Sequence, residues 1–568
     1  MGSIATQRRY GSSLAIAVTA VLAGIALRIG PAWGEGILGD GDAWQNLWNI
    51  EHVRRWLLGS SELYTTRMLW APEGVGLGAH TLALSFSLPA AAASFLVGSP
   101  LAYNLAVFAS FLLCAWAAYR LASTLGLGAV GALLAALVIT FSPPRFARSF
   151  GHLNLLGLGW VLLALEGMIA SLQATERGQK WRSDARTAFG VCATIYTDYY
   201  LAVLLGIGAV AVLATSGWIA ADDRGRRVAR LVGALALGFC LAVPQLLATL
   251  RDAGAVARGH DSKWCSCAIT SLVVPGRLQV VSGLTEPLTE KNHQNKVEGP
   301  AYLGISLLLC SATQWRRVRG GVLAVTIAGV AALVLSLGPQ VRAFDKLLEI
   351  PLPYAGLRTV APFLDKGGCV TRFIQLAYVP LGILFAMWAE RAWRRSRLGA
   401  VTVCGIAFVE FLPLRPTVEG WQLQTDPALT ELARQEVGVV ADVEGGAWPL
   451  IRQLQHGQPV FTGYVSKLPE ASLLRRQAEP AWAYLSADGP VPPDPAHSAR
   501  GLAVRWGVRW VVGPARPEFE AKAGVLHLQE LARSDRSLVY ALPGETSARE
   551  EATSAFAGPR SPATPSSG

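Results

Sequence analysis

The chain has 568 residues, of which 52% are hydrophobic and 16% are charged, and its mean hydropathy is +0.36. Soluble domains cannot bury that much apolar surface, so lipid must cover part of it and a soluble enzyme is excluded. The formal charge of +11 does not indicate a nucleic-acid partner, because the basic residues gather in short loops between hydrophobic segments.

The N-terminus begins with Arg8 and Arg9 before an apolar run, Leu14 to Leu27, as secretory signals do. No clean small-residue cleavage site follows this run. We therefore expect an uncleaved first membrane helix.

Hydrophobic segments of roughly 17 to 20 residues, enough to cross about 30 Å of hydrocarbon, recur along the first 415 residues. They lie near 14–34, 102–120, 126–142, 153–172, 199–218, 231–250, 320–338, 373–390 and 398–414, with shorter candidates near 187–198 and 301–315. The basic loops after 172, 218, 315 and 390 should be cytoplasmic.

This charge pattern predicts an α-helical polytopic membrane protein with a cytoplasmic N-terminus and about eleven transmembrane helices. It requires that 79–97, which has Pro89 at its centre, forms a re-entrant or juxtamembrane helix. The predicted transmembrane domain covers 1–415. Its outer-face loops are 35–78, 143–152, 251–300 and 339–372.

The C-terminal part has a different character. Short strand-like runs stand at Val437–Val443, Ala503–Val512 and Ser537–Leu542, separated by helical stretches such as Ala428–Gln435. We expect a small extracytoplasmic α/β domain over 416–543. Residues 544–568 are rich in Ser, Ala, Pro and Glu, which predicts a disordered tail.

The eight cysteines form no disulfide framework, because most stand in apolar runs where a thiol behaves as a small hydrophobic group. Cys265, Cys267 and Cys369 lie in polar segments. For these three, free thiols are favoured over a disulfide, and a metal site comes last.

Two carboxylates, Asp40 and Asp42, stand on a glycine-containing turn after the first hydrophobic segment. The apolar spacing that follows predicts a helix lying in the membrane interface. Acidic residues at a helix N-terminus commonly only stabilise the helix dipole. The alternatives are a site for Mg²⁺ or Mn²⁺ and a base that takes a proton from a hydroxyl group.

Several stretches together resemble a known group of membrane proteins. They are Asp42–Trp48, Phe141–His152, Glu298–Gly304, Leu337–Pro339 and Gly356–Arg358. In their order and predicted outer-face placement they resemble bacterial polyprenyl-phosphate-sugar-dependent glycosyltransferases of the GT-C superfamily. The resemblance covers most of 1–415 and touches the C-terminal domain.

The resemblance implies a GT-C-like fold and sugar transfer from a polyprenyl-phosphate donor to a lipid- or glycan-linked acceptor. It places the reaction, with inversion, on the outer face of the bacterial cytoplasmic membrane. Because an acidic residue of the first outer loop is the usual base or metal ligand of GT-C enzymes, it implies that role for Asp42, with Asp40 as partner. The sequence lacks the paired Asp-Glu or Glu-x-Asp form of protein mannosyltransferases and oligosaccharyltransferases, which argues against a protein acceptor.

Other polar residues on the outer face are candidate substrate ligands. They are His152, Arg145, Arg148, Asp198, Tyr199, Glu298, Arg358 and Arg372. Arg358 and Arg372 are assigned to the phosphate leaving group, because guanidinium donors stabilise developing phosphate charge.

Each of these assignments has a structural alternative. His152 suits a helix cap, Arg145 and Arg148 suit headgroup anchors, and Tyr199 suits an aromatic belt. For the whole protein, the alternatives are a lipid or polysaccharide flippase and a non-catalytic scaffold for envelope assembly.

Overall fold

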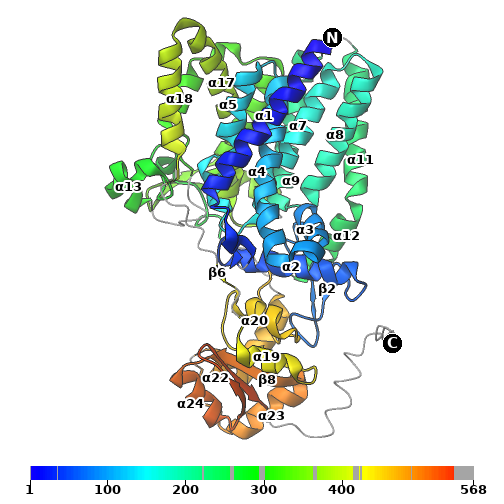
Figure 1. Cartoon of the computed structure of the whole chain (residues 1–568), viewed down its shortest axis with the longest axis vertical. Helices are drawn as coiled ribbons and strands as arrows, with labels where there is room; N and C mark the ends of the chain where they lie inside the picture. The colour runs from blue at the N-terminus through cyan, green and yellow to red at the C-terminus, as the bar shows by residue number, and fades with distance from the viewer. Residues whose placement is uncertain are drawn as a thin grey trace. The chain divides into compact units, whose positions relative to one another are not determined.

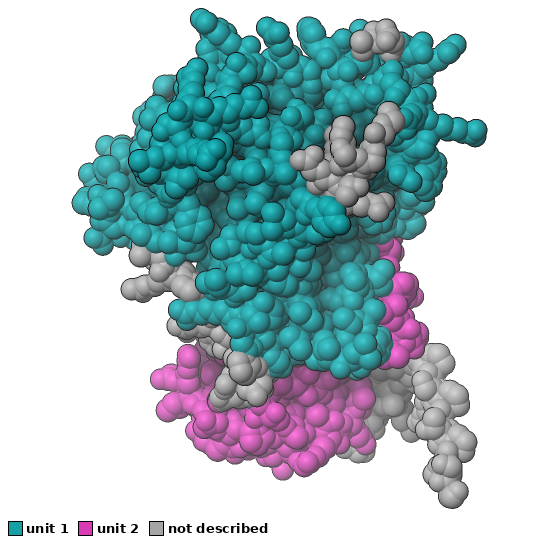
Figure 2. All heavy atoms as spheres, turned by 45° about the horizontal axis from the view of Figure 1, so that its top comes forward, with its two compact units in different colours: residues 1–54, 81–247, 258–422 teal, residues 55–80, 248–257, 423–568 magenta. Residues whose placement is uncertain are grey.

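The computed structural model describes most of the chain. The described residues are 2–34, 36–220, 223–255, 261–292, 301–361, 367–413, 421–422, 425–467, 469–487 and 489–542. The chain divides into two compact units, coloured separately in Figure 2. Unit 1 comprises Met1–Arg54, Thr81–Leu247 and Arg258–Gln422, and unit 2 comprises Arg55–His80, Ala248–Ala257 and Leu423–Gly568.

Unit 1 is built from helices, and each predicted hydrophobic segment overlaps one of them (Figure 1). They are α1 (Gly2–Ala26), α4 (Ser99–Thr124), α5 (Ala129–Thr140), α7 (Leu158–Gln173), α8 (Arg177–Ile195), α9 (Tyr199–Ala214), α11 (Arg224–Leu241), α14 (Ile305–Ala312), α15 (Gly320–Ser336), α17 (Tyr378–Arg395) and α18 (Arg397–Phe411). Apolar segments form helices because a helix satisfies its own backbone hydrogen bonds, which lipid cannot do.

Within the described residues, three helical stretches are long and apolar enough to cross a membrane alone: Ser99–Thr124, Leu153–Gln173 and Val370–Arg395. A fourth candidate is α11 with α12 (Val243–Asp252), which are bent by 57° at their junction. The remaining apolar helices are shorter. The number of crossings therefore stays a prediction.

The segment around Pro89 forms α3 (Leu84–Val97), whose 14 residues fall short of the ~20 that a crossing helix needs. Figure 1 shows α3 and α2 (Asp42–Leu57) at the end of the helix bundle opposite the N-terminus of α1. In α2, all residues from 43 to 50 are buried, the polar Gln45, Asn46 and Asn49 included, so this part of the helix is covered on every side and not only on the apolar face that the sequence indicates.

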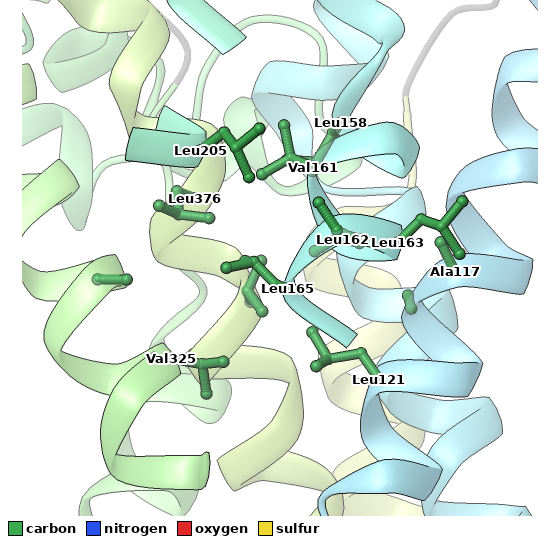
Figure 3. Close-up of a cluster of buried hydrophobic side chains, with 14 of the residues drawn as sticks. Ala117, Leu121, Leu158, Val161, Leu162, Leu163, Leu165, Leu205, Val325 and Leu376 are labelled. Carbon is green, nitrogen blue, oxygen red and sulfur yellow. The ribbon is translucent and has the colours of Figure 1, made fainter. Parts of the chain in front are cut away.

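The core of unit 1 surrounds α7, as Figure 3 shows. Leucine and valine side chains of α7 meet Leu121 of α4, Leu205 of α9, Val325 of α15 and Leu376 of the 3₁₀-helix η8 (Val370–Ala377). All of these side chains are buried. This packing fixes the positions of α7 and η8 in unit 1.

Short strands complete unit 1. β1 (Gly36–Ile37) pairs antiparallel with β6 (Trp421–Gln422), and β4 (Gln340–Ala343) pairs antiparallel with β5 (Lys346–Pro351).

Unit 2 is an α/β unit with a four-stranded sheet in the order β7-β8-β10-β9. The strands are β7 (Val439–Asp442), β8 (Val508–Pro514), β10 (Ser537–Ala541) and β9 (Gln529–Arg533), of which only β7 and β8 pair in parallel. The helices are α19 (Pro427–Arg434), α20 (Trp448–His456), α21 (Glu470–Gln477), α22 (Pro480–Ser486), α23 (Pro495–Trp506) and α24 (Pro517–Val525). The predicted tail, 544–568, lies outside the described residues.

The strand predicted at Ala503–Val512 is wrong in its first half, because α23 continues to Trp506. The side chain of Asp494 accepts a hydrogen bond from the His497 backbone and starts this helix, and Gly507 ends it in the left-handed conformation. Strand β9 was not predicted, because its exposed Glu and Arg residues lack a strand-like apolar pattern.

Unit 2 also contains part of the first predicted outer loop, including the β2 (Thr65–Thr66) and β3 (Val75–Gly76) hairpin. Arg476 of α21 is fully buried and donates hydrogen bonds to the carbonyl oxygens of Trp70 and Ala71. It also forms an ion pair with Glu73 at 3.1 Å. A guanidinium group with this many partners can be buried at little cost, so it joins the two segments firmly.

Candidate functional site

The two loops richest in sequence motifs meet at Asp42 and His152. Asp42 is the first residue of α2, and His152 precedes the 3₁₀-helix η2 (Leu153–Leu156). The Nε2 atom of His152 lies 3.2 Å from a carboxylate oxygen of Asp42. The side chain of Asp42 is 33% exposed and that of His152 is 15% exposed. A solvent-accessible carboxylate is therefore oriented by a mostly covered imidazole.

Asn46 and two backbone segments hold this pair together. The Nδ2 atom of Asn46 donates to the carbonyl oxygens of Asp42 at 2.9 Å and Gly151 at 2.7 Å. The backbone N–H of Asp40 donates to the carbonyl oxygen of Phe150 at 3.3 Å. Asn46 is 1% exposed, so its side chain is a buried cross-link between the two loops.

The approach of the two loops requires glycine at two positions. A Cβ atom on Gly151, whose φ is +143°, would lie 2.7 Å from the carbonyl oxygen of Asp40. A Cβ atom on Gly39, whose φ is +93°, would lie 2.5 Å from the carbonyl carbon of Phe150. Both the φ angles and the close contacts exclude larger residues.

Asp40 is exposed, and one of its carboxylate oxygens accepts a hydrogen bond from the backbone N–H of Gly41 at 2.6 Å. Among the residues that the structure describes, no group of three or more His, Cys, Asp or Glu side chains is arranged to hold a metal ion. Two carboxylates completed by water can hold Mg²⁺. Cation binding by Asp40 and Asp42 thus stays a prediction.

Arg145 and Arg148 lie on α6 (Pro143–Arg148), and both are fully buried. Arg145 donates to the carbonyl oxygens of Ser110 at 2.7 Å and Leu156 at 3.0 Å. Its guanidinium group also lies 4.7 Å from the ring centre of Phe111. These contacts connect α6 to α4 and η2, which supports the loop that carries His152.

A second polar cluster forms around Asp198. One carboxylate oxygen of Asp198 accepts from Asn154 at 2.5 Å, and the other accepts from the backbone N–H of Tyr200 at 2.7 Å. Asn154 is two residues beyond His152, so η2 connects the two clusters. Asp198 is 3% exposed and caps α9.

Arg372 belongs to this second cluster. Its guanidinium group lies 4.8 Å from the ring centre of Tyr200 and is close enough to Asp198 for their charges to interact. The hydroxyl oxygen of Tyr200 accepts from the backbone N–H of Cys369 at 3.0 Å. Tyr199 instead lies near Gln245, whose side-chain amide donates to its hydroxyl oxygen at 3.3 Å.

A disulfide bond joins Cys265 to Cys369, three residues before Arg372. The sequence favoured free thiols for both, and the structure corrects this, because the fold brings together two cysteines that are 104 positions apart. The backbone N–H of Thr371 also donates to the carbonyl oxygen of Cys265. The segment that carries Arg372 is therefore attached to Cys265 by a disulfide bond and by a backbone hydrogen bond. Cys267 is buried and does not take part in a disulfide bond.

Arg358 is half-buried on α16 (Pro353–Val360). Glu298 lies outside the described residues. The sequence analysis did not identify Asn46, Asn154 or Tyr200. Asn46 could have been identified from the sequence, because it stands four residues after Asp42 and therefore lies on the same face of α2.

Solved structures of membrane glycosyltransferases of the GT-C superfamily resemble this chain. ArnT from Cupriavidus metallidurans in the apo state is 14% identical, with a TM-score of 0.54 over 93% of this chain and 97% of that chain. The arabinofuranosyltransferase AftD from Mycobacteria is 16% identical, with a TM-score of 0.60 over 95% of this chain and 40% of that chain.

The archaeal oligosaccharyltransferase AglB from Archaeoglobus fulgidus is 12% identical, with a TM-score of 0.50 over 91% of this chain and 71% of that chain. At these identities the likeness is one of fold, so the chain has the GT-C fold. No curated protein matches the sequence. The family described as "Domain of unknown function (DUF6311)" matches residues 14–429, and the protein belongs to this family.

Proposed function

We propose that this protein is a glycosyltransferase that moves a sugar from a polyprenyl-phosphate donor to a lipid- or glycan-linked acceptor. The reaction takes place on the outer face of the bacterial cytoplasmic membrane, with the N-terminus in the cytoplasm. The observation that carries the proposal is the Asp42–His152 pair, in which an accessible carboxylate is fixed by an imidazole at 3.2 Å.

Asp42 acts as the base. It takes the proton from the acceptor hydroxyl group while the hydroxyl oxygen attacks the anomeric carbon of the sugar. The bond from this carbon to the phosphate oxygen breaks, and the electron pair leaves with the polyprenyl phosphate. A single displacement of this kind inverts the configuration at the anomeric carbon.

His152 positions Asp42 and does not replace it as the base. Its Nε2 atom is directed to the carboxylate, and its Nδ1 atom is buried, so neither nitrogen faces an incoming acceptor. An imidazole N–H beside one carboxylate oxygen limits the orientations that the carboxylate can adopt. This is how a histidine–carboxylate pair fixes geometry.

Arg372 receives the phosphate of the leaving group. Its position on the disulfide-linked segment and over Tyr200 limits the conformations of its long side chain. A preorganised guanidinium group stabilises developing phosphate charge better than a mobile one. A solved structure of ArnT, 15% identical with a TM-score of 0.53, contains undecaprenyl phosphate, which supports a lipid-linked phosphate as ligand.

The test is sugar transfer by the purified full-length protein in lipid nanodiscs. A panel of labelled polyprenyl-phosphate sugars is offered with and without Mg²⁺ or Mn²⁺, and wild type is compared with Asp42→Asn and Asp40→Asn. We expect transfer or donor hydrolysis in wild type and its loss in folded Asp42→Asn. Movement of lipid-linked sugar across vesicles without any transfer would instead support a flippase.

A further inference from the structure

The segment 280–291 of unit 1 has an unusual distribution of polar and apolar side chains. It consists of the 3₁₀-helix η5 (Val280–Thr285) followed by α13 (Glu286–Lys291). The polar residues Ser282 and Thr289 are only 8% and 7% exposed. The apolar residues Leu284 and Leu288 are 86% and 42% exposed. The charged residues Glu286, Glu290 and Lys291 are exposed as well, so the outer side of the segment is amphipathic, as in segments that lie in a membrane interface.

The inward polar groups are bonded to the protein. The hydroxyl group of Thr289 donates to the carbonyl oxygen of Pro275 at 3.0 Å and lies 3.1 Å from that of Thr285. Gln279, which directly precedes the segment, is 2% exposed. Its side-chain amide oxygen accepts a hydrogen bond from the backbone N–H of Gly276 at 2.5 Å. Because these groups turn inward to bond, the two leucines must turn outward.

The segment is attached to the end of α18. The backbone N–H of Val280 donates to the carbonyl oxygen of Leu412 at 2.8 Å, and Gln279 forms an antiparallel bridge with Pro413. Figure 1 shows α13 standing out from the helix bundle beside this end of α18. The two elements therefore contribute to the same side of unit 1.

Helix α18 presents an apolar surface on that side. Only Ala400 and Ala407 of this helix are buried, while Ile406, Phe408 and Val409 are 50%, 54% and 45% exposed. In a membrane protein, an apolar helix with so little contact to its neighbours faces lipid. The exposed leucines of 280–291 extend this lipid-facing surface beyond the end of the helix.

We infer that residues 280–291 form a lateral membrane anchor, in which Leu284 and Leu288 insert among the acyl chains of the lipid next to α18. The charged residues of the segment suit the headgroup level, where Arg277 and Glu290 form an ion pair at 2.5 Å and Lys291 ends α13. The partner of this surface is the lipid bilayer. This inference does not depend on the proposed transfer reaction.

Site-specific fluorescence on the full-length protein tests the anchor. Cys192, Cys240 and Cys404 are replaced by serine, and an environment-sensitive nitrobenzoxadiazole label is attached to Leu284→Cys. The matched control carries the label at Glu518→Cys, an exposed position of α24 in unit 2. Both proteins are reconstituted in vesicles with and without lipids that carry a nitroxide on the acyl chain.

We expect nitroxide lipids to quench the label at 284 by about twofold or more relative to 518, and iodide in the buffer to quench 518 more strongly. Equal quenching by iodide at both positions would overturn the inference. Protection of 284 from both quenchers would also overturn it, because a second copy or another protein would then cover the segment. A label at Leu288→Cys provides a second position if the first variant does not fold.

Discussion

The Nε2 atom of His152 lies 3.2 Å from a carboxylate oxygen of Asp42, although the two residues belong to loops that are far apart in the sequence. The two loops touch along their backbones, through Asp40 and Phe150, and through the buried side chain of Asn46. Such a pair of loops, fixed on the ends of packed helices, keeps a reactive carboxylate in one orientation.

Replacement of Asp42 by asparagine should reduce sugar transfer by about 10²- to 10⁴-fold, because an amide cannot accept the proton of the acceptor hydroxyl group. Asp40→Asn is the matched control, since Asp40 is exposed and its carboxylate accepts a hydrogen bond from the backbone N–H of Gly41. Steady-state transfer rates in nanodiscs measure both variants. A rate for folded Asp42→Asn equal to that of wild type would remove Asp42 from the reaction.

His152→Gln should retain more activity than His152→Ala. A glutamine amide can still donate to Asp42 near the position of Nε2, whereas alanine leaves the carboxylate without this partner. We expect about a 10-fold lower kcat for the alanine variant, corresponding to ~1.4 kcal/mol, with little change in KM for the donor. An equal decrease of kcat in both variants would mean that the hydrogen bond to Asp42 does not contribute to the rate.

Several parts of this architecture could be predicted from the sequence because they depend on local patterns. Apolar runs predicted the helices of unit 1, and apolar spacing after Asp42 predicted α2. The polar residues Asp42 and His152 were identified individually from their motifs. Their contact was not predicted, because it depends on how α2 and η2 pack at the end of the bundle.

Long-range pairings account for what the sequence did not reveal. The partner of Cys265 lies 104 positions away and depends on how the chain between them folds, so no local pattern selects Cys369. The inclusion of 55–80 in unit 2 depends on the buried contacts of Arg476 with Trp70 and Ala71, which join distant segments. Individual long-range contacts leave no periodicity in a sequence.

Gly151→Ala should impair transfer while leaving the helices of unit 1 intact. The added Cβ atom would lie 2.7 Å from the carbonyl oxygen of Asp40, so the two loops must separate. Gly41→Ala is the control, because its φ is +55° and nothing lies within 4 Å of its added Cβ atom. Both variants add backbone strain, which is larger at the φ of +143° of Gly151 than at the left-handed φ of Gly41, but only Gly151→Ala displaces Asp42.

Transfer rates and circular dichroism distinguish the two glycine variants. We expect a loss of about 10-fold or more for Gly151→Ala and a small change for Gly41→Ala, with equal helix content. A comparable decrease of the transfer rate in both variants would mean that backbone strain alone, and not displacement of Asp42, lowers the rate.

The disulfide between Cys265 and Cys369 should be found in protein purified without reductant, by mass spectrometry of peptides after thiol alkylation. Disulfides persist in oxidising compartments, so its presence supports the outer-face position of both loops. Cys265→Ser with Cys369→Ser should raise KM for the donor, since the segment that carries Arg372 becomes less constrained. Cys267→Ser, which removes a buried cysteine outside the disulfide bond, is the control.

Acid should destabilise unit 2 through His456. This side chain is 3% exposed, and its Nδ1 atom accepts from the backbone N–H of Gln458 at 3.0 Å. Burial, together with the nearby charge of Arg452, lowers the pKa of His456 to about 3. The unfolded chain takes up a proton below its ordinary pKa of about 6.5, whereas the folded chain does not until about pH 3. The free energy of unfolding therefore falls as the pH drops through this window, by up to ~1.4 kcal/mol per pH unit.

Asp442 has the opposite effect, because burial raises its pKa to about 6 and the folded state then binds a proton more tightly than the unfolded state. His456→Asn isolates the histidine, since it keeps an acceptor for Gln458 and leaves Asp442 in place. Urea unfolding of unit 2 in the full-length protein, followed by pulse proteolysis, gives the free energy of unfolding at pH 7.5 and pH 5. Wild type should lose more stability than His456→Asn between these values. Equal losses would show that another group controls the acid sensitivity of unit 2.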